Sequence, residues 1–231
     1  FIDVLGVGRS LLQLTFDRFK GICPPENVWV LTNHKYADLV HEQLPEVPVG
    51  NILREPCRRN TAPCIAYVSW RIKNADVNAN IVVTPSDHIV TDTEEFRRVI
   101  MQGLNFTAET DAIVTLGMRP NRPETGYGYI QADLRSPSAR NKEIFRVDQF
   151  REKPDLATAQ KYIQQNNFYW NAGIFIWSVR TVVNAFRIYQ PSLANIFESI
   201  ADVYGTENEQ KVIDERFPEC ENISVDYAIM E

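Results

Sequence analysis

The sequence predicts an α/β fold, with a largely parallel sheet flanked by helices. Short runs of apolar and β-branched residues alternate with longer segments in which apolar residues recur at helical spacing. This alternation is typical of strand–helix–strand units, whose helices cover the faces of the sheet. With 231 residues, 44% of them hydrophobic, the chain is long enough to bury a sizeable core. Because no repeat, low-complexity linker or interior boundary interrupts it, we expect a single domain over residues 1–231.

The first half of the chain supplies the regular part of this pattern. Its predicted strands span residues 28–32, 51–54, 81–84 and 112–116, and its predicted helices span 36–44, 61–74 and 93–109. Each predicted strand is short and apolar, and Pro85 ends the third. We expect Thr61 and Thr93 to cap the second and third helices, because a threonine hydroxyl can accept a hydrogen bond from a backbone N–H of the first turn.

The second half departs from the pattern and then returns to helices. Residues 117–150 combine alternating polarity, prolines and charged loops, which predicts an antiparallel excursion over the edge of the sheet. Loops in such positions commonly carry ligand contacts. The remaining predicted helices span residues 156–165, 179–189, 192–204 and 207–217, with one predicted strand at 173–177.

Charge and cysteine content exclude several classes of protein. The formal net charge is -6 and the isoelectric point is near 5.2, whereas a general nucleic-acid binder would present a basic face. Four cysteines without C-x-x-C spacing indicate free thiols in a reducing compartment. The most apolar part of the longest uncharged stretch, around residues 170–179, is too short to cross a bilayer and carries Asn171. We therefore expect a soluble, cytoplasmic protein without nucleic-acid or membrane partners.

The most informative motif is the run Pro-Glu-Thr-Gly-Tyr-Gly-Tyr-Ile at residues 123–130, followed by Glu152 and Lys153. Glycine lets backbone groups approach a ligand closely, and tyrosine offers a flat face and a hydroxyl. A glutamate can accept hydrogen bonds from sugar hydroxyls, while a lysine supplies a charge for phosphate. These residues can form a pocket for a phosphorylated sugar. Taken alone, they are explained more simply as a hairpin with a glycine bulge and an exposed ion pair.

Two aspartates are candidates for a metal site. Asp87 follows the predicted strand at 81–84, and ligands of open α/β sheets bind beyond the carboxyl ends of the strands. Mg²⁺ takes one or two protein carboxylates and leaves its other positions to phosphates and water. Asp87 is explained equally well as a turn residue, and Asp226 as a helix N-terminal residue behind Ser224. Sequence spacing does not show that the two aspartates meet.

Two further runs carry polar groups at the ends of predicted elements. Residues 55–63 join a strand to a helix N-terminus, whose N–H groups, together with Asn60 and Thr61, can read the edge of a nucleobase. Helix capping is the simpler alternative. Asn171 lies between large aromatic residues and Gly173, so its amide can bond a sugar hydroxyl while the aromatic residues belong to the core.

Six motifs follow one another over nearly the whole chain. They are Glu55-Pro-x-x-Arg-Asn-Thr-Ala-Pro63, Thr84-Pro-Ser-Asp-His88, Pro123-Glu-Thr-Gly-Tyr-Gly-Tyr-Ile130, Glu152-Lys-Pro154, Trp170-Asn-Ala-Gly-Ile-Phe175 and Ser224-Val-Asp-Tyr-Ala-Ile-Met-Glu231. Together, and in this order, they closely resemble the mannose-1-phosphate guanylyltransferases, or GDP-mannose pyrophosphorylases, of the sugar nucleotidyltransferase family. Six ordered matches are far more specific than any one of them.

The resemblance implies a fold with a Rossmann-like mixed, mainly parallel sheet, and it implies a nucleotidyl transfer reaction. GTP and mannose 1-phosphate would give GDP-mannose and pyrophosphate by Mg²⁺-assisted, in-line attack of the sugar phosphate on the α-phosphorus. By the same resemblance Asp87 and Asp226 hold Mg²⁺, Lys153 pairs with the sugar phosphate, and a homodimer is one possible assembly. The implied sugar contacts are Gly126, Tyr127, Glu152 and Asn171, and the implied nucleotide contacts are Glu55, Pro56, Arg59, Asn60 and Thr61.

The chain departs from the family pattern at both ends. Family members begin with a strand and a glycine-rich loop, followed by an arginine and a lysine that wrap the triphosphate. Phe1-Ile2-Asp3 resembles the segment just after that loop. We therefore expect the loop, and a further C-terminal region, to be absent from this chain.

Two other functions stay open at this level. One is a thymidylyl- or uridylyltransferase for glucose 1-phosphate, against which the motif at 55–63 favours the guanylyl type. The other is a non-catalytic regulatory subunit that binds GDP-mannose. The presence of Asp87, Lys153 and Asp226 favours an enzyme over that subunit.

Overall fold

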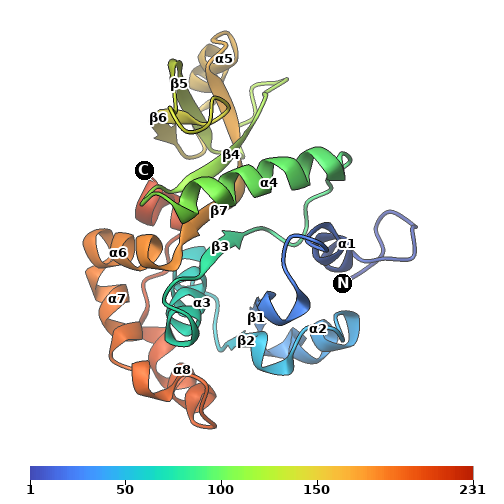
Figure 1. Cartoon of the computed structure of the whole chain (residues 1–231), viewed down its shortest axis with the longest axis vertical. Helices are drawn as coiled ribbons and strands as arrows, with labels where there is room; N and C mark the ends of the chain where they lie inside the picture. Colours follow the sequence, from blue (N-terminus) through green and yellow to red (C-terminus); the bar gives the residue numbers. More distant parts are fainter. Residues whose placement is uncertain (231) are drawn as a thin grey trace.

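The computed structural model describes residues 1–230, which form two β-sheets with helices around them (Figure 1). The strands are β1 (Val30–Asn33), β2 (Ile52–Glu55), β3 (Asn80–Val83), β4 (Val114–Met118), β5 (Tyr129–Pro137), β6 (Phe145–Arg151) and β7 (Phe168–Ser178). The α-helices are α1 (Leu11–Arg18), α2 (Ala37–Gln43), α3 (Thr61–Ala75), α4 (Thr93–Ala108), α5 (Leu156–Ile163), α6 (Val179–Tyr189), α7 (Pro191–Glu198) and α8 (Glu209–Arg216). A short helical turn, η6, spans Asp226–Met230. Among the described residues, no helix has the length and apolar character needed to cross a lipid bilayer.

Strand β7 is the centre of the larger sheet. It pairs with β3, β4 and β5, and each of these pairings is antiparallel. The sheet has the order β3-β7-β5-β6, and β4 also pairs with β7. Within residues 1–230, the pairing of β1 with β2 is the one parallel pairing, and it forms a separate two-stranded sheet. The prediction of a mainly parallel sheet is therefore wrong, although the mixed α/β class is confirmed.

The error has a topological cause. β3, α4 and β4 form a strand–helix–strand unit, as the sequence predicts, and both strands run antiparallel to β7, hence parallel to each other. They do not pair with each other, because both pair with β7, which comes much later in the chain. The local pattern of strand and helix reports the crossover, but it carries no signal for a strand inserted from a distant part of the chain.

Most predicted elements are present with shifted ends. Helix α6 has the predicted bounds, and the excursion predicted at 117–150 is the β5–β6 hairpin. That hairpin and α5 form one end of the molecule, away from α3 and α8 (Figure 1). Strand β7 begins at Phe168, five residues before the predicted start at 173. The prediction was too late because the aromatic residues of the first half of β7 were interpreted as core residues. Helix α1 was not predicted, although Ser10 and Gln13 form a capping box at its start.

Two predicted helix caps are one residue too late. The N-cap residues of α3 and α4 are Asn60 and Asp92, whose side chains accept hydrogen bonds from first-turn N–H groups. Asn60 has a φ of 64°, a left-handed conformation that asparagine tolerates better than threonine. Thr61 and Thr93 are instead the first helical residues. Thr61 is thereby free to bond a different part of the chain.

The core lies on both faces of β7. Phe175 and Trp177 pack with buried residues of α3, α6 and α7. Ile174 and Ile176 pack on the other face with Phe96 and its neighbours on α4. This division follows from the alternation of side chains along a strand. The second half of β7 is therefore held from both sides, while its first half extends toward the β5–β6 hairpin.

Candidate functional site

The candidate site lies where the pairing of β4 with β7 is interrupted. Thr115 pairs with Phe175 and Gly117 pairs with Asn171, so four steps along β7 match two along β4. Gly173 makes this bulge possible, because its φ of 66° is a conformation that favours glycine. A Cβ on Gly173 would lie 3.3 Å from Cγ of Pro85. The loop after β3, which carries Asp87, therefore packs against the bulge.

Asn171, at the start of the bulge, is hydrogen-bonded through both ends of its side-chain amide. Its Oδ1 accepts from the Thr115 hydroxyl (3.0 Å) and from the Gly173 N–H (3.1 Å). Its Nδ2 donates to Oδ1 of Asp226 (2.8 Å), at the start of η6. Two motifs that lie far apart in the sequence are thus brought together.

The carboxyl group of Asp226 is partly withdrawn from solvent. Burial raises its pKa, while the hydrogen bond from Asn171 and the charge of Lys153 oppose that rise. Because the ammonium of Lys153 acts on this carboxylate, the loop after β6 also reaches the site. Asp226 is therefore held by one hydrogen bond and one nearby cation.

Glu152 and Lys153 differ sharply in exposure. The Glu152 side chain is 8% exposed and the Lys153 side chain 58%, with Nζ of Lys153 3.4 Å from Oε1 of Glu152. Lys153 has a φ of 44°, which is uncommon for a residue other than glycine. The turn thus buries a carboxylate and presents an ammonium beside it.

Gly128 connects the glycine–tyrosine motif, residues 123–130, to the side chains of Glu152 and Asn171. Its carbonyl oxygen accepts a hydrogen bond from the backbone N–H of Asn171 (2.8 Å). A Cβ on Gly128 would lie 2.5 Å from Oε2 of Glu152, 3.2 Å from the Phe150 ring and 3.3 Å from Cβ of Asn171. The side chains of Glu152 and Asn171, both predicted sugar contacts, therefore lie close together at Gly128, where a larger residue would displace the Glu152 carboxylate. Gly128 belongs to the predicted motif, but its own role was not predicted.

The two other predicted sugar contacts, Gly126 and Tyr127, lie at the exposed edge of the motif. The N–H of Gly126 donates to Oε1 of Glu124 (3.1 Å), so this group stabilises the turn. Tyr127 is 44% exposed and its ring meets Trp170 edge to face, with centroids 5.4 Å apart. Arg122 covers the same Trp170 ring at 5.3 Å. This edge offers an exposed aromatic ring beside the buried polar groups.

The predicted nucleotide motif lies at the N-terminus of α3, in contact with the segment that precedes Asp226. The Thr61 hydroxyl accepts from the Val225 N–H (2.9 Å), and the Ala62 N–H donates to the Ile223 carbonyl (3.1 Å). The guanidinium of Arg59 donates to the carbonyl of Pro218 (2.5 Å). These bonds attach the motif to the C-terminal segment.

The other members of that motif lie nearby. Glu55 is half-buried at the end of β2, and its carboxylate accepts a weak bond from the Cys64 thiol (3.4 Å). Pro56 is half-buried, and the side chain of Asn60 caps the helix. The groups of this motif that could contact a ligand are therefore the Glu55 carboxylate and the N-terminus of α3.

Asp87 lies in an exposed loop that a buried arginine supports. Its side chain is 78% exposed, and its Oδ1 is 4.0 Å from Nε2 of His88. The buried guanidinium of Arg18, on α1, donates to the His88 carbonyl (2.7 Å) and to the Thr15 hydroxyl (2.8 Å). Burial lowers the pKa of Arg18, although a guanidinium stays protonated in proteins. Sequence reasoning missed Arg18, because α1 itself was not predicted.

Asp87 and Asp226 are the predicted ligands of a divalent cation. The Asp87 loop packs on Gly173, and Asp226 bonds Asn171 two residues earlier in β7. Two carboxylates are the protein donor set that Mg²⁺ takes when phosphate and water oxygens complete its shell. In the part of the chain that the structure describes, no group of three or more His, Cys, Asp or Glu side chains is placed to hold a metal. Oxygen atoms of a bound substrate would have to supply the rest.

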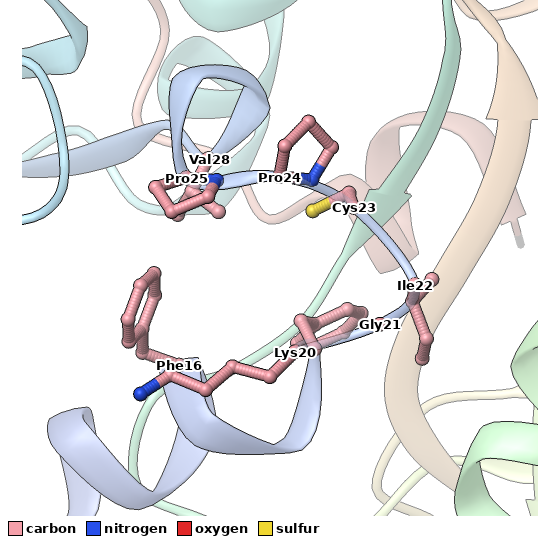
Figure 2. Close-up of a pocket in the computed structure, with 9 residues that line it drawn as sticks. Phe16, Lys20, Gly21, Ile22, Cys23, Pro24, Pro25 and Val28 are labelled. Atoms are coloured by element: carbon pink, nitrogen blue, oxygen red, sulfur yellow. The ribbon is translucent and has the colours of Figure 1, made fainter.

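Two cavities differ in how close they lie to the candidate site residues. One of about 350 Å³ is lined by residues 16–28, including Phe16, Lys20 and Pro24, and none of the candidate site residues lines it (Figure 2). Another, of about 300 Å³, is lined by Asp87 and by Thr32 of β1. The second cavity therefore adjoins the candidate site, beside β1.

Known proteins resemble this chain over almost all of its length. It is 34% identical over 227 residues to a mannose-1-phosphate guanylyltransferase of Escherichia coli, covering 96% of this chain and 48% of that protein. It is 32% identical over 234 residues to the xanthan biosynthesis protein XanB of Xanthomonas campestris pv. campestris, covering 100% of this chain and 48% of that protein. The chain thus spans about half the length of the curated relatives it matches.

Solved structures and a family model agree with these similarities. The crystal structure of mannose-1-phosphate geranyltransferase from Thermus thermophilus is 29% identical, with a TM-score of 0.83 over 97% of this chain and 62% of that one. Mannose-6-phosphate isomerase from Helicobacter pylori, 22% identical over 96% of this chain and 84% of that one, has the same fold with a TM-score of 0.79. The model of the nucleotidyl transferase family matches residues 4–212. Because that match takes in most of the chain, the protein belongs to the nucleotidyl transferase family.

Proposed function

We propose that the protein transfers GMP from GTP to mannose 1-phosphate, giving GDP-mannose and pyrophosphate. The observation that supports this most strongly is the meeting of Glu152, Asn171 and Asp226 around the bulge of β7. The buried carboxylate and the amide suit the hydroxyl groups of a sugar, while the nearby Lys153, or a cation held by the second carboxylate, would be needed to meet a phosphate group. Relatives in which about a third of the aligned residues are identical bear the name of this activity.

The sugar would lie against the glycine–tyrosine motif. Gly128 leaves room for the Glu152 carboxylate, which can accept hydrogen bonds from two neighbouring sugar hydroxyls. Tyr127, exposed beside Trp170, offers a flat face to the ring of the sugar. Gly126 shapes the turn that holds Tyr127 in place. Asn171 completes this side of the pocket.

Lys153 would hold the phosphate of the sugar. Its ammonium is exposed and lies beside Glu152, so it can pair with a phosphate attached to a sugar that Glu152 holds. A phosphate oxygen of mannose 1-phosphate then attacks the α-phosphorus of GTP. The bond between that phosphorus and the oxygen bridging to the β-phosphate breaks, and pyrophosphate leaves. The chain contributes positioning and charge rather than a nucleophile of its own.

Asp87 and Asp226 would hold Mg²⁺ for this reaction. A bound Mg²⁺ supplies neutralisation of the negative charge on the phosphates. The bond from Asn171 and the charge of Lys153 favour the ionised form of Asp226, which is the form that binds a cation. The buried Arg18 supports the loop of Asp87 through the His88 carbonyl.

The guanine base would lie near the N-terminus of α3. The Glu55 carboxylate can accept hydrogen bonds from the N–H groups on the Watson–Crick edge of guanine, which uracil and thymine cannot offer in the same arrangement. Asn60 and Thr61 form the start of the helix, Pro56 follows Glu55, and Arg59 precedes Asn60. We also propose that the enzyme is cytoplasmic and homodimeric, and sedimentation of the full-length protein measures its assembly.

Pyrophosphate release by the full-length protein tests this function. The assay contains Mg²⁺ and mannose 1-phosphate with GTP, UTP or dTTP, and is repeated with glucose 1-phosphate. We expect release with GTP and mannose 1-phosphate to exceed every other combination. Faster release with UTP or dTTP and glucose 1-phosphate would support a uridylyl- or thymidylyltransferase. Binding of GDP-mannose without any release would support a regulatory subunit.

The Asp87→Asn variant tests the proposed cation site. The amide keeps the size of the side chain but removes its charge, and Asp87 is exposed, so the fold should be retained. We expect kcat to fall by about two orders of magnitude or more, as when a charge-stabilising group is removed from an active site. A near-normal kcat in a folded variant would remove Asp87 from the mechanism.

A further inference from the structure

Thr115 lies outside every motif that marks the site, yet its hydroxyl occupies the centre of the β7 bulge. It sits on β4, and its Oγ1 is 3.0 Å from Oδ1 of Asn171 and 3.1 Å from the carbonyl oxygen of Ile174. Both of these atoms are acceptors only, so the one hydroxyl proton serves one of them at a time. The bulge removes regular ladder bonds at this point, and the hydroxyl takes their place.

The contacts of Asn171 fix which way its amide faces. The Gly173 N–H can only donate, so Oδ1 of Asn171 must face it. The Nδ2 group then faces Asp226, whose ionised carboxylate can only accept. Rotating the amide by half a turn would set oxygen against carboxylate oxygen and N–H against N–H. The Thr115 hydroxyl adds a second donor on the Oδ1 side and so favours the same orientation.

We propose that Thr115 is a positioning residue, which acts through the amide of Asn171 to hold the Asp226 carboxylate in place. The proposal rests on the proposed function insofar as Asp226 binds the cation of that reaction. It also assigns Asn171 a second task beside its proposed sugar contact, since both ends of its amide are hydrogen-bonded within the protein. Thr115 touches no reacting group, and its effect passes through two hydrogen bonds.

Replacement by an isosteric residue separates the hydroxyl from the shape of the side chain. In Thr115→Val the methyl group stays and the hydroxyl is lost, whereas Thr115→Ser keeps the hydroxyl. Because residues that orient metal ligands typically contribute about 10–100-fold, we expect Thr115→Val to lower kcat by about tenfold with little change in KM for GTP. The Kd for Mn²⁺, titrated alone and followed by electron paramagnetic resonance, should rise by a similar factor. Thr115→Ser should restore both.

Thr107 supplies a matched control. Its hydroxyl also donates to an asparagine amide, that of Asn80, at 2.9 Å, but Thr107 lies on α4, away from the site, and is fully buried whereas Thr115 is half-buried. Thr107→Val should lower thermal stability and leave kcat and the Mn²⁺ Kd unchanged. If Thr115→Val behaves in the same way, its hydroxyl only stabilises the bulge and the proposal is overturned.

A double-mutant cycle shows whether Thr115 acts through Asn171. In an Asn171→Ala background, Thr115→Val should have no further effect on kcat or on the Mn²⁺ Kd, because the connecting amide is already gone. Fully additive effects would overturn the proposal. The Mn²⁺ titration needs no turnover, so it decides the role of Thr115 even if the protein fails to release pyrophosphate from GTP. That failure would instead contradict the proposed function.

Discussion

At the scale of single residues, Gly128 is a position of the candidate site where an added side chain would be crowded. A Cβ there would meet the carboxylate of Glu152 and the side chains of Phe150 and Asn171 at once. We expect Gly128→Ala to displace Glu152 and to raise KM for mannose 1-phosphate by about tenfold, which corresponds to about 1.4 kcal/mol of lost binding. Initial rates of pyrophosphate release give this value. Gly50→Ala, where no atom lies within 4 Å of the added carbon, should match the wild type.

At Asp226 the cost of a buried charge stands against its proposed role in binding a cation. Its carboxyl is partly buried and its pKa is raised, so the ionised form is less favourable in the folded protein than in the unfolded chain. We expect Asp226→Asn to abolish turnover and yet to raise the melting temperature at neutral pH by a few degrees, measured by calorimetry with chelator present. A lower melting temperature in this variant would contradict the assigned cost of the buried charge.

The same group predicts a pH dependence. As the pH falls through the raised pKa of Asp226, the folded protein takes up the proton before the unfolded chain does, so this group's contribution to stability increases. The increase ends below the pKa of an aspartate in the unfolded chain. The difference in the free energy of unfolding between Asp226→Asn and the wild type should therefore become smaller from neutral to acidic pH. A difference that stays constant would show that burial does not perturb this carboxyl.

At the scale of elements, the start of α3 is attached to the segment that carries Asp226. The Thr61 hydroxyl accepts from the N–H of Val225, a residue that is itself buried. In Thr61→Val this N–H loses its partner, and we expect the free energy of unfolding in urea to fall by about 1 kcal/mol. Thr61→Ser keeps the hydroxyl acceptor, so its free energy of unfolding should fall by less. Equal losses in both variants would point to the methyl group rather than the hydrogen bond.

The elements also show how far the sequence predicts the structure. Helix α6 could be predicted to its ends, because its apolar face and its Ser178 cap are local signals. The first half of β7 could not, since aromatic residues beside Asn171 suit a core as well as a strand. The parallel sheet was predicted wrongly because strand order depends on contacts between distant segments. Local sequence signals thus identify helices and strands better than they identify which strands pair in a sheet.

At the scale of the whole molecule, the site could be predicted as a set of motifs but not as an arrangement. The motifs around Glu152, Asn171 and Asp226 were recognised, and the structure places these three residues together at β7. Thr115 and Arg18 support the site through hydrogen bonds from other elements, and neither has a distinctive sequence context. Residues that act through a neighbour depend on the fold, so a pattern of residue types alone does not find them.

Because β7 carries the site in its first half and the core in its second, stability and activity should be separable along this one strand. Helix α4 packs so closely on β7 that a Cβ on Gly103 would overlap Cδ1 of Ile176. Gly103→Ala should therefore destabilise the protein by about 1–3 kcal/mol through overpacking, without changing KM for either substrate in the folded fraction.

Ile176→Val removes the overlapping carbon and on its own should cost about 0.5–1.5 kcal/mol. The double variant should be more stable than Gly103→Ala, because the two changes compensate in volume at one contact. Urea unfolding of the four proteins measures the coupling. Simple addition of the two losses would mean that α4 moves away from β7 instead of repacking against the shorter side chain.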